Sequence, residues 1–145
     1  MSAPLRVLAL FGALLCWPAL GQEGPPRHLA EIELHTAEEL RGVLLRAEQL
    51  LANGAMVLGD PAPVTFVLHG PEVKILLRQN YLANKSTVDL AASLSALGVV
   101  EIKACETWMG GSGIAVDELQ PFVGTVAYGP TEIRRLVDDE NFLYF

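Results

Sequence analysis

The stretch Val64-Thr-Phe-Val-Leu-His-Gly-Pro71 determines the fold class that we expect. Its first five residues are apolar or β-branched without alternating charged side chains, and such short runs are typical of strands buried on both faces. Strands of this kind occur mainly in parallel sheets that helices cover on both sides. Because Gly70 and Pro71 end the run, we expect a central strand over residues 64–68, with His69 at its carboxyl end.

The segments on either side alternate between strand and helix patterns. Two predicted capping boxes, Thr36 with Glu39 and Ser86 with Asp89, each precede an apolar helical face. Further expected strands cover residues 28–34, 99–104, 125–127 and 142–145, and further helical segments cover residues 72–77, residues 117–120 and the residues after Pro130. This alternation predicts an α/β fold with a mostly parallel sheet and helices on both faces, and it leaves the strand order open.

The first 21 residues have the features of a signal peptide. Arg6 supplies a positive charge, residues 7–17 form a short apolar core, and Ala19 and Gly21 provide a small-x-small cleavage site. The apolar run is about half the length of a bilayer span, which argues against a permanent membrane helix. We therefore expect export to the periplasm, with residues 1–21 removed.

After cleavage we expect a short tether and one domain. Residues 22–27 contain Gly24, Pro25 and Pro26, and residues 28–145 have the usual length of a single domain. An uncleaved anchor is one alternative. A lipoprotein processed at Cys16 is another, although the bulky Leu15 before it argues against that reading.

The charge balance excludes two classes of partner. The chain has 17 acidic and 10 basic residues and a net charge of −7, and signal cleavage would remove only one charged side chain, Arg6. An acidic domain lacks the basic surface that binds nucleic acid phosphates. It also lacks a basic patch for anionic lipids, so we expect no nucleic acid partner and no membrane association after cleavage.

Cys105 is the residue that most strongly suggests a chemical function. The only other cysteine, Cys16, lies within the expected signal peptide. An exported protein with an odd number of cysteines is expected to form an intermolecular bond or to have a reactive thiol.

The expected topology places Cys105 in a crevice. In parallel α/β sheets, sites form outside the carboxyl ends of the strands. Three loops should leave those ends, at residues 69–71, 105–107 and 128–130. The side chains and turns that we expect to line the site around Cys105 are His69, Gly70, Thr107, Trp108, Tyr128 and Gly129.

Two interpretations of Cys105 remain open from local chemistry. Lys103, two residues earlier and on the same side of the strand, would favour a reactive thiolate, whereas a nearby Glu106 carboxylate would oppose it. The alternative is a buried cysteine that serves as a small hydrophobic residue.

The other candidate residues are less specific. His69 could act as a base or hydrogen-bond donor toward the thiol, or it could bond only to backbone. One cysteine and three scattered histidines do not form a metal-ligand pattern, so we expect neither a metal nor a cofactor. Glycines within residues 110–113 predict a mobile or tightly turned loop, with Trp108 and Met109 either covering the thiol or packing on the core.

Four segments follow a pattern known from one family. They are Val64–Lys74, Leu97–Cys105, Tyr128–Ile133 and Phe142–Phe145. The strand with its His-Gly turn, the Gly-Val…Cys strand and the closing Gly-x-x-Glu-Ile pattern resemble the DsrE/DsrF-like family of sulfur relay proteins. The resemblance covers nearly the whole mature chain.

The resemblance implies a small flavodoxin-like α/β domain that assembles into oligomers, often trimers or hexamers. It also implies sulfur relay through Cys105, the one position whose role carries over. Many members have Cys-x-Asn-Thr after the strand, whereas this chain has Cys105-Glu-Thr-Trp108. The better-known relay members are cytoplasmic, so an exported member would have a different sulfur donor and acceptor.

Three functions follow as hypotheses. The first is a periplasmic sulfur carrier or sulfurtransferase that holds sulfane sulfur as a persulfide on Cys105 and exchanges it with a donor or acceptor protein. The second is a non-catalytic, oligomeric binding module in which the cysteine is structural. The third is a thiol redox protein, which would need a partner's thiol because the chain has no Cys-x-x-Cys pair.

Overall fold

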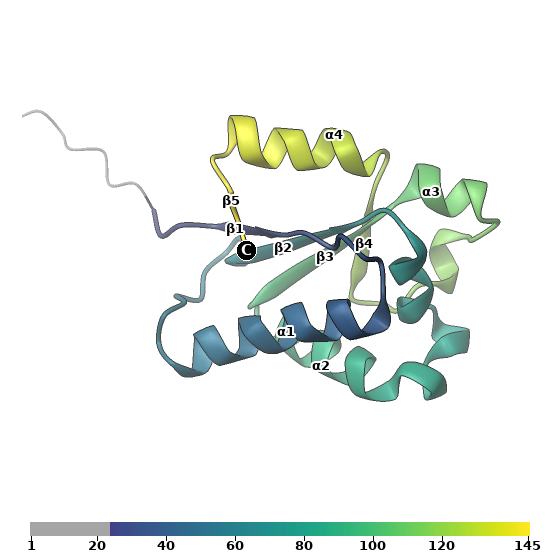
Figure 1. Cartoon of the computed structure of the whole chain (residues 1–145), viewed down its shortest axis with the longest axis horizontal. Helices are drawn as coiled ribbons and strands as arrows, with labels where there is room; N and C mark the ends of the chain where they lie inside the picture. The colour runs from purple at the N-terminus through teal and green to yellow at the C-terminus, as the bar shows by residue number, and fades with distance from the viewer. Residues whose placement is uncertain (1–23) are drawn as a thin grey trace, which may run out of the picture.

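Five parallel strands form one sheet in the computed structural model, which describes residues 24–145 (Figure 1). Their order is β4-β3-β2-β1-β5. The strands are β1 (His28–Ala30), β2 (Val64–Leu68), β3 (Val100–Cys105), β4 (Val123–Val126) and β5 (Leu143–Tyr144). The expected signal peptide, residues 1–21, lies outside the described residues, as do the first two residues of the tether.

Helices cover both faces of the sheet, which confirms the predicted α/β class. In Figure 1, α1 and α2 lie on one face, α4 lies on the other, and α3 lies beyond the carboxyl ends of the strands. The α-helices are α1 (Ala37–Ala52), α2 (Lys85–Ala96), α3 (Glu106–Gly111) and α4 (Gly129–Arg134), which continues into the π-helical turn η5 (Arg135–Asp139). Short 3₁₀ helices are η1 (Pro71–Leu76), η2 (Arg78–Asn80), η3 (Leu82–Asn84) and η4 (Val116–Glu118).

The handedness of the crossovers explains why α4 lies on its own face. The first three connections step across the sheet from β1 to β4, whereas the last returns from β4 to β5 beside β1. Parallel crossovers are almost always right-handed, so reversing the direction of travel places the connecting helix on the opposite face.

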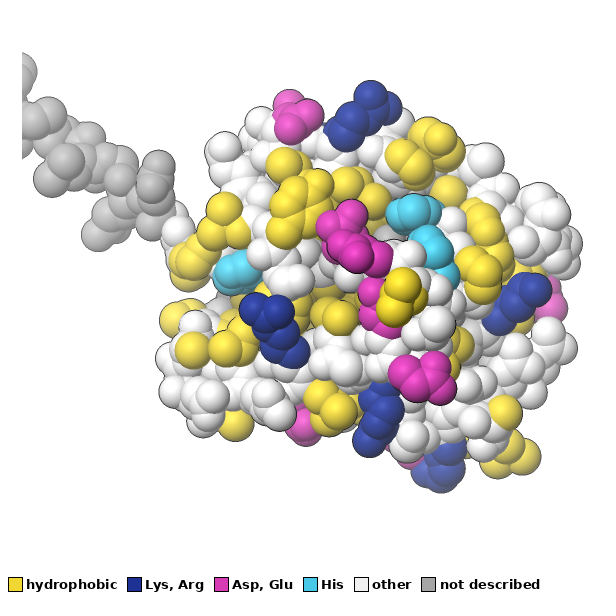
Figure 2. Space-filling model, in the orientation of Figure 1, with side chains coloured by type: hydrophobic (Ala, Val, Ile, Leu, Met, Phe, Trp, Pro, Cys, Tyr) yellow, Lys and Arg dark blue, Asp and Glu magenta, His cyan; other side chains and the backbone are white. Residues whose placement is uncertain are grey.

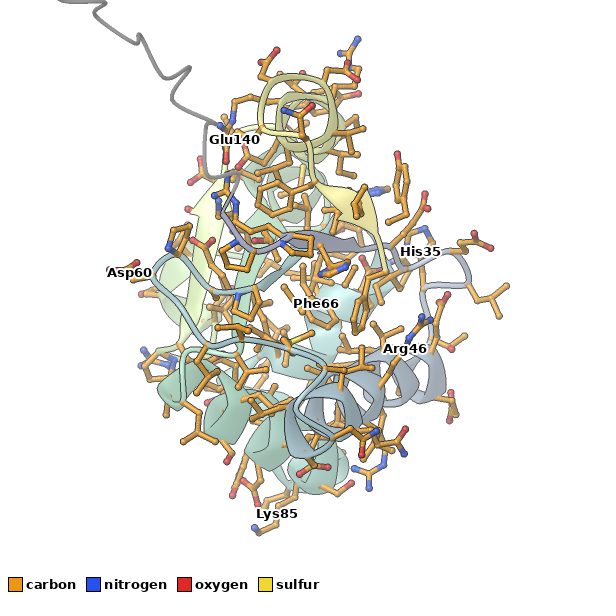
Figure 3. All side chains as sticks on the ribbon, turned by 90° about the vertical axis from the view of Figure 1, so that its left-hand side faces the viewer. His35, Arg46, Asp60, Phe66, Lys85 and Glu140 are labelled. Carbon is orange, nitrogen blue, oxygen red and sulfur yellow. The ribbon has the colours of Figure 1, made fainter. Side chains whose placement is uncertain are left out.

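The strand β2 is buried along its whole length, as the sequence predicts. Phe66 belongs to the main hydrophobic cluster with α1 and α2, and Val67 belongs to a smaller cluster with Leu136 and Phe142 on the α4 side. Figure 3 shows Phe66 between the sheet and the helices. Since successive side chains point to opposite faces, a strand between two covered faces must be apolar throughout.

The same alternation orients Cys105 toward α4. Ile102 and Ala104 of β3 belong to the main cluster on the α1 and α2 side. Lys103 and Cys105 therefore point the other way, where each is hydrogen-bonded to a residue of α4.

The first strand is shorter than predicted. It ends at Ala30, whereas the sequence pattern predicts a strand to residue 34. The Glu39 carboxylate accepts hydrogen bonds from the backbone N–H groups of Glu33 and Leu34, at 2.8 and 2.7 Å. Those amides therefore bond to a side chain of α1 and not to a neighbouring strand. The N-cap bond from the Glu39 N–H to the Thr36 hydroxyl, at 3.1 Å, is confirmed.

The second predicted capping box is wrong. Helix α2 begins at Lys85, one residue before Ser86, and its N-cap Asn84 makes no side-chain cap bond. Asp89 instead accepts a hydrogen bond from the Tyr81 hydroxyl at 2.8 Å and pairs with Lys85. An i,i+4 ion pair in the first turn thus takes the place of the box.

The glycine-rich segment after Cys105 is helical where a loop was predicted. Helix α3 covers Glu106–Gly111, and Met109 is buried in the main cluster, with Trp108 packed against it. Packing of these two large side chains holds the segment in place despite its glycines. The tight turn begins only afterwards, where Gly113 has a φ of +69°.

The chain ends against the sheet as a short strand. Phe142 is buried beneath the Arg27 guanidinium, whose carbon lies 4.6 Å from the ring centre, and β5 pairs with β1. Within residues 24–145, no helix combines the length and apolar character needed to cross a bilayer.

Candidate functional site

Three parallel strands end beside one another at the candidate site. His69 follows β2, Cys105 ends β3, and Gly129 begins α4 shortly after β4. The Gly129 N–H donates a hydrogen bond to the Cys105 sulfur, at 3.2 Å. The predicted meeting of these three loops at the carboxyl edge of the sheet is therefore present in the structure.

Gly129 fits tightly between the other two residues. A β-carbon built at this position would lie 2.9 Å from His69 Cβ and 3.4 Å from Cys105 Cβ. Carbon atoms in van der Waals contact are normally 3.5–4.0 Å apart. Any side chain at position 129 would thus displace the backbone that donates to the sulfur.

Cys105 has a free thiol and is 2% exposed. The Gly129 N–H places partial positive charge beside the sulfur. Burial restricts access to the sulfur. The thiol therefore has one backbone hydrogen-bond donor and almost no contact with solvent.

The expected activating cation is engaged elsewhere. Lys103 Nζ lies 3.0 Å from Glu132 Oε1 and 3.6 Å from Glu101 Oε2. Hydrogen bonds from Arg135 and Lys103 overcome the effect of burial and lower the pKa of Glu132 to about 2. Lys103 is thus paired with carboxylates, so it contributes less to the thiol than its place in the sequence suggests.

The Glu106 carboxylate has a hydrogen-bond partner other than the thiol. Its Oε1 accepts a hydrogen bond from the Thr125 hydroxyl of β4, at 2.6 Å. The carboxylate is exposed, where water screens its repulsion of a thiolate. The opposition expected from Glu106 is correspondingly weak.

The remaining predicted lining residues have separate roles. Thr107 donates to the Ala127 carbonyl through both its N–H, at 3.2 Å, and its hydroxyl, at 2.7 Å, which ties α3 to the end of β4. Trp108 packs against the main core, one of the two roles considered for it. Tyr128 is half-exposed at the N-cap position of α4.

Sequence reasoning missed two residues at this edge, Glu72 and His35. Glu72 is 1% exposed, and its Oε1 accepts hydrogen bonds from the backbone N–H groups of His69 and Gly70, at 2.9 and 3.0 Å. Its Oε2 lies 2.7 Å from His35 Nδ1. The ring of His35 in turn meets that of His69 edge-on, with centroids 5.4 Å apart.

The figures agree with this arrangement. Histidine side chains lie side by side at the surface in Figure 2, consistent with the contact between His35 and His69. Gly70 allows the close approach, because a β-carbon there would lie 2.5 Å from His35 Nδ1 and 2.7 Å from Glu72 Oε2.

One of the two missed residues left a signal in the sequence. Glu72 follows His69-Gly-Pro71, and an acidic side chain in the first turn after such a stop can bond back to free backbone amides. His35 left none, because it reaches Glu72 across 37 residues of chain.

Two other features bear on what the site can hold. In the part of the chain that the structure describes, no three His, Cys, Asp or Glu side chains are grouped as metal ligands. A cavity of about 930 Å³ lies at the opposite, amino-terminal edge of the sheet, near Arg27, Asp60 and Glu140. Figure 3 labels Asp60 and Glu140. The cavity is separate from the thiol.

The fold and the site together define a class: a parallel α/β domain with a buried free thiol at the carboxyl end of an inner strand. No known protein family and no curated protein matches the sequence. Among solved structures, the chain is similar to MTH1491, a protein of unknown function from Methanobacterium thermoautotrophicum. The two share 25% sequence identity with a TM-score of 0.56, over 81% of this chain and 93% of the archaeal one. The similarity supports the α/β fold.

Proposed function

We propose that this protein carries sulfane sulfur as a persulfide on Cys105, in the manner of the DsrE/DsrF-like proteins that its sequence resembles. The observation that supports the proposal most directly is the hydrogen bond from the Gly129 N–H to the Cys105 sulfur. This donor lies at the carboxyl edge of a parallel sheet, where α/β proteins usually bind ligands.

The proposed reaction is a transfer between sulfur atoms. The Cys105 thiolate attacks the outer sulfur of a persulfide donor, R–S–SH. The donor S–S bond breaks, R–S⁻ leaves with the electron pair, and Cys105–S–SH forms. The exchange needs no external oxidant or reductant, because one S–S bond replaces another.

Burial of the thiol restricts the class of donor. With Cys105 2% exposed, a small species such as a persulfide, polysulfide or thiosulfate reaches the sulfur more easily than a folded protein does. A protein donor or acceptor would require the surrounding loops to open. As part of the proposal, donor and acceptor are periplasmic, since we infer that the chain is exported.

The same burial favours a second candidate function. A cysteine that is almost inaccessible and closely packed can serve as a small apolar residue. The protein would then be an oligomeric binding module without sulfur chemistry.

Mass spectrometry of the native protein separates the two candidates. After exposure to polysulfide, the carrier should gain about 32 Da, the mass of one sulfur atom, on Cys105 and release it to a thiol reductant. The Cys105→Ser variant should gain nothing. If the native wild-type protein resists both sulfuration and alkylation while the denatured protein is alkylated, the cysteine is structural.

We also propose that the protein is a homo-oligomer, either a trimer or a hexamer. The family resemblance supports this, together with the exposure of Leu143 and Tyr144 at 55% and 59%. Light scattering across the micromolar range should give three or six times the protomer mass, and a monomer throughout would contradict the proposal.

A further inference from the structure

A buried carboxylate stands beside the proposed site without a role in the sulfur transfer. Glu72 lies in η1, its side chain is inaccessible to solvent, and three donors converge on its two oxygens. Buried carboxylates are costly unless they are fully bonded. All three of these bonds lead to His69 or to its immediate neighbours.

One carboxylate thereby fixes His69 at two points. Oε1 accepts from the backbone N–H of His69 itself and from that of Gly70, which sets the turn after β2. Oε2 binds His35, whose ring packs edge-on against the ring of His69. The backbone and the imidazole of His69 are thus both held by Glu72, the imidazole through His35.

The contact with Glu72 also sets which ring nitrogen of His35 donates. Because Oε1 already accepts two N–H groups and Oε2 faces His35 Nδ1, the proton of this contact belongs on Nδ1. A histidine oriented by a carboxylate is the arrangement by which enzymes fix a tautomer.

His69 is held against the thiol site on its other side. The Gly129 backbone that donates to the Cys105 sulfur also contacts His69, since a β-carbon there would be 2.9 Å from His69 Cβ and 3.5 Å from its Cγ. His69 and Cys105 thus both border Gly129 at the ends of the neighbouring strands β2 and β3, and the His69 ring also contacts His35.

We infer that Glu72 and His35 are positioning residues that hold the His69 imidazole beside Cys105 as the acceptor of the thiol proton. The inference deepens the proposed function and rests on it, because sulfur transfer is the reaction in which the thiolate would act. In the step, the Cys105 S–H bond breaks, its electron pair stays on sulfur, and the proton passes to an imidazole nitrogen of His69.

The other titratable groups near the thiol are committed or exposed. Lys103 is paired with Glu132 and Glu101, and Glu106 is bonded to Thr125. The titratable side chains on the elements around the thiol, besides His69, are His35, Glu72, Lys74, Glu101, Lys103, Glu106, Tyr128, Glu132 and Arg134. Of these, only His35 and Glu72 are linked to His69 by the contacts described above.

The test measures thiolate directly and does not depend on access to the sulfur. Ultraviolet absorbance of the thiolate is followed against pH in the wild type and in Glu72→Gln, His35→Asn and His69→Gln. From each curve, that of the same protein carrying Cys105→Ser is subtracted. Asparagine suits position 35, because His35 has a φ of +53° and asparagine tolerates this region. Each variant should have about tenfold less thiolate at about pH 7, a displacement of one pH unit. All should reach the wild-type plateau at about pH 11, where hydroxide removes the proton.

His28→Gln is the matched control, since this histidine lies at the far end of β1 beside Phe145. Its curve should coincide with that of the wild type. Circular dichroism identifies any variant that fails to fold, and the inference is then judged on the variants that do fold. Unchanged curves in the folded variants would overturn the inference and leave the sulfur proposal standing. Displaced curves in a protein that takes up no sulfur would support the inference and contradict the sulfur proposal.

Discussion

Gly129 is the residue on which the geometry of the thiol depends, because it contacts His69 and donates to the Cys105 sulfur at the same time. Neither role requires an unusual backbone angle. Both require that no side chain be present, so the constraint is steric and local.

Replacing this glycine with alanine tests that constraint. Gly129→Ala places a methyl group 2.9 Å from His69 Cβ, and overpacking of this kind costs about 1–3 kcal/mol. Urea unfolding should show that loss, and the rate of Cys105 sulfuration should fall. Gly110→Ala is the control, since a β-carbon there meets nothing within 4 Å. As position 110 is helical, its alanine should be neutral or stabilising by up to about 1 kcal/mol. Equal stabilities of the two variants would contradict the steric account.

At the scale of the elements, ion pairs connect α4 and η5 to the rest of the fold. Glu132 accepts from Lys103 of β3, at 3.0 Å, and from Arg135, at 2.8 Å. Arg135 also pairs with Glu140, whose other oxygen lies 3.0 Å from Arg27. The apolar cluster on this face of the sheet is much smaller than the main core, so these pairs contribute to the attachment of α4 and η5.

The pairing of Glu132 predicts acid sensitivity. Its pKa is about 2 in the folded protein, against 4.5 for the free side chain, so ionised Glu132 stabilises the fold. This contribution is fully present above about pH 4.5 and is lost as the pH falls toward about 2, where the folded state also binds the proton. Urea unfolding at several pH values should show a loss of about 1 kcal/mol for Glu132→Gln at neutral pH, shrinking as the pH falls through this window.

Glu48→Gln on the exposed side of α1 provides the comparison for that measurement. It removes the same charge from a position that forms no ion pair with any of residues 24–145. A difference between the two variants that stayed constant from neutral pH to about pH 2 would show that Glu132 does not act through its charge.

At the scale of the whole molecule, the fold depends on a sheet covered on both faces. Phe66 of the central strand is fully buried between β2 and the helices α1 and α2. Phe66→Ala should therefore cost about 3–5 kcal/mol in chemical denaturation. Leu82→Ala, at a residue that is 85% exposed, should stay within about 0.5 kcal/mol of the wild type. A small loss for Phe66→Ala would contradict the core that the structure describes.

The sequence predicts this architecture where burial controls the pattern. The apolar run of β2 and the strand ending in Cys105 are found where their composition places them, because β2 is buried along its whole length and β3 buries its alternate apolar residues. The patterns fail where one particular side-chain contact decides the local structure. Glu39 ends β1 early, Lys85 and Tyr81 take Asp89 from its capping box, and Trp108 with Met109 stabilises a helix among glycines.

The candidate site likewise has one part that the sequence predicts and one part that it does not. Topology alone predicts that Cys105, His69 and Gly129 meet, since they follow adjacent parallel strands. The Glu72–His35 pair depends on one contact between segments distant in sequence. No local pattern encodes such a contact.

The central claim is that Cys105 is a sulfur carrier, and intact-mass spectrometry of the native protein in polysulfide tests it most directly. We predict one added sulfur atom per chain, about 32 Da, mapped to Cys105, removed by a thiol and absent from Cys105→Ser. A native wild-type protein that gains no mass under conditions in which free cysteine is converted to its persulfide would contradict the claim.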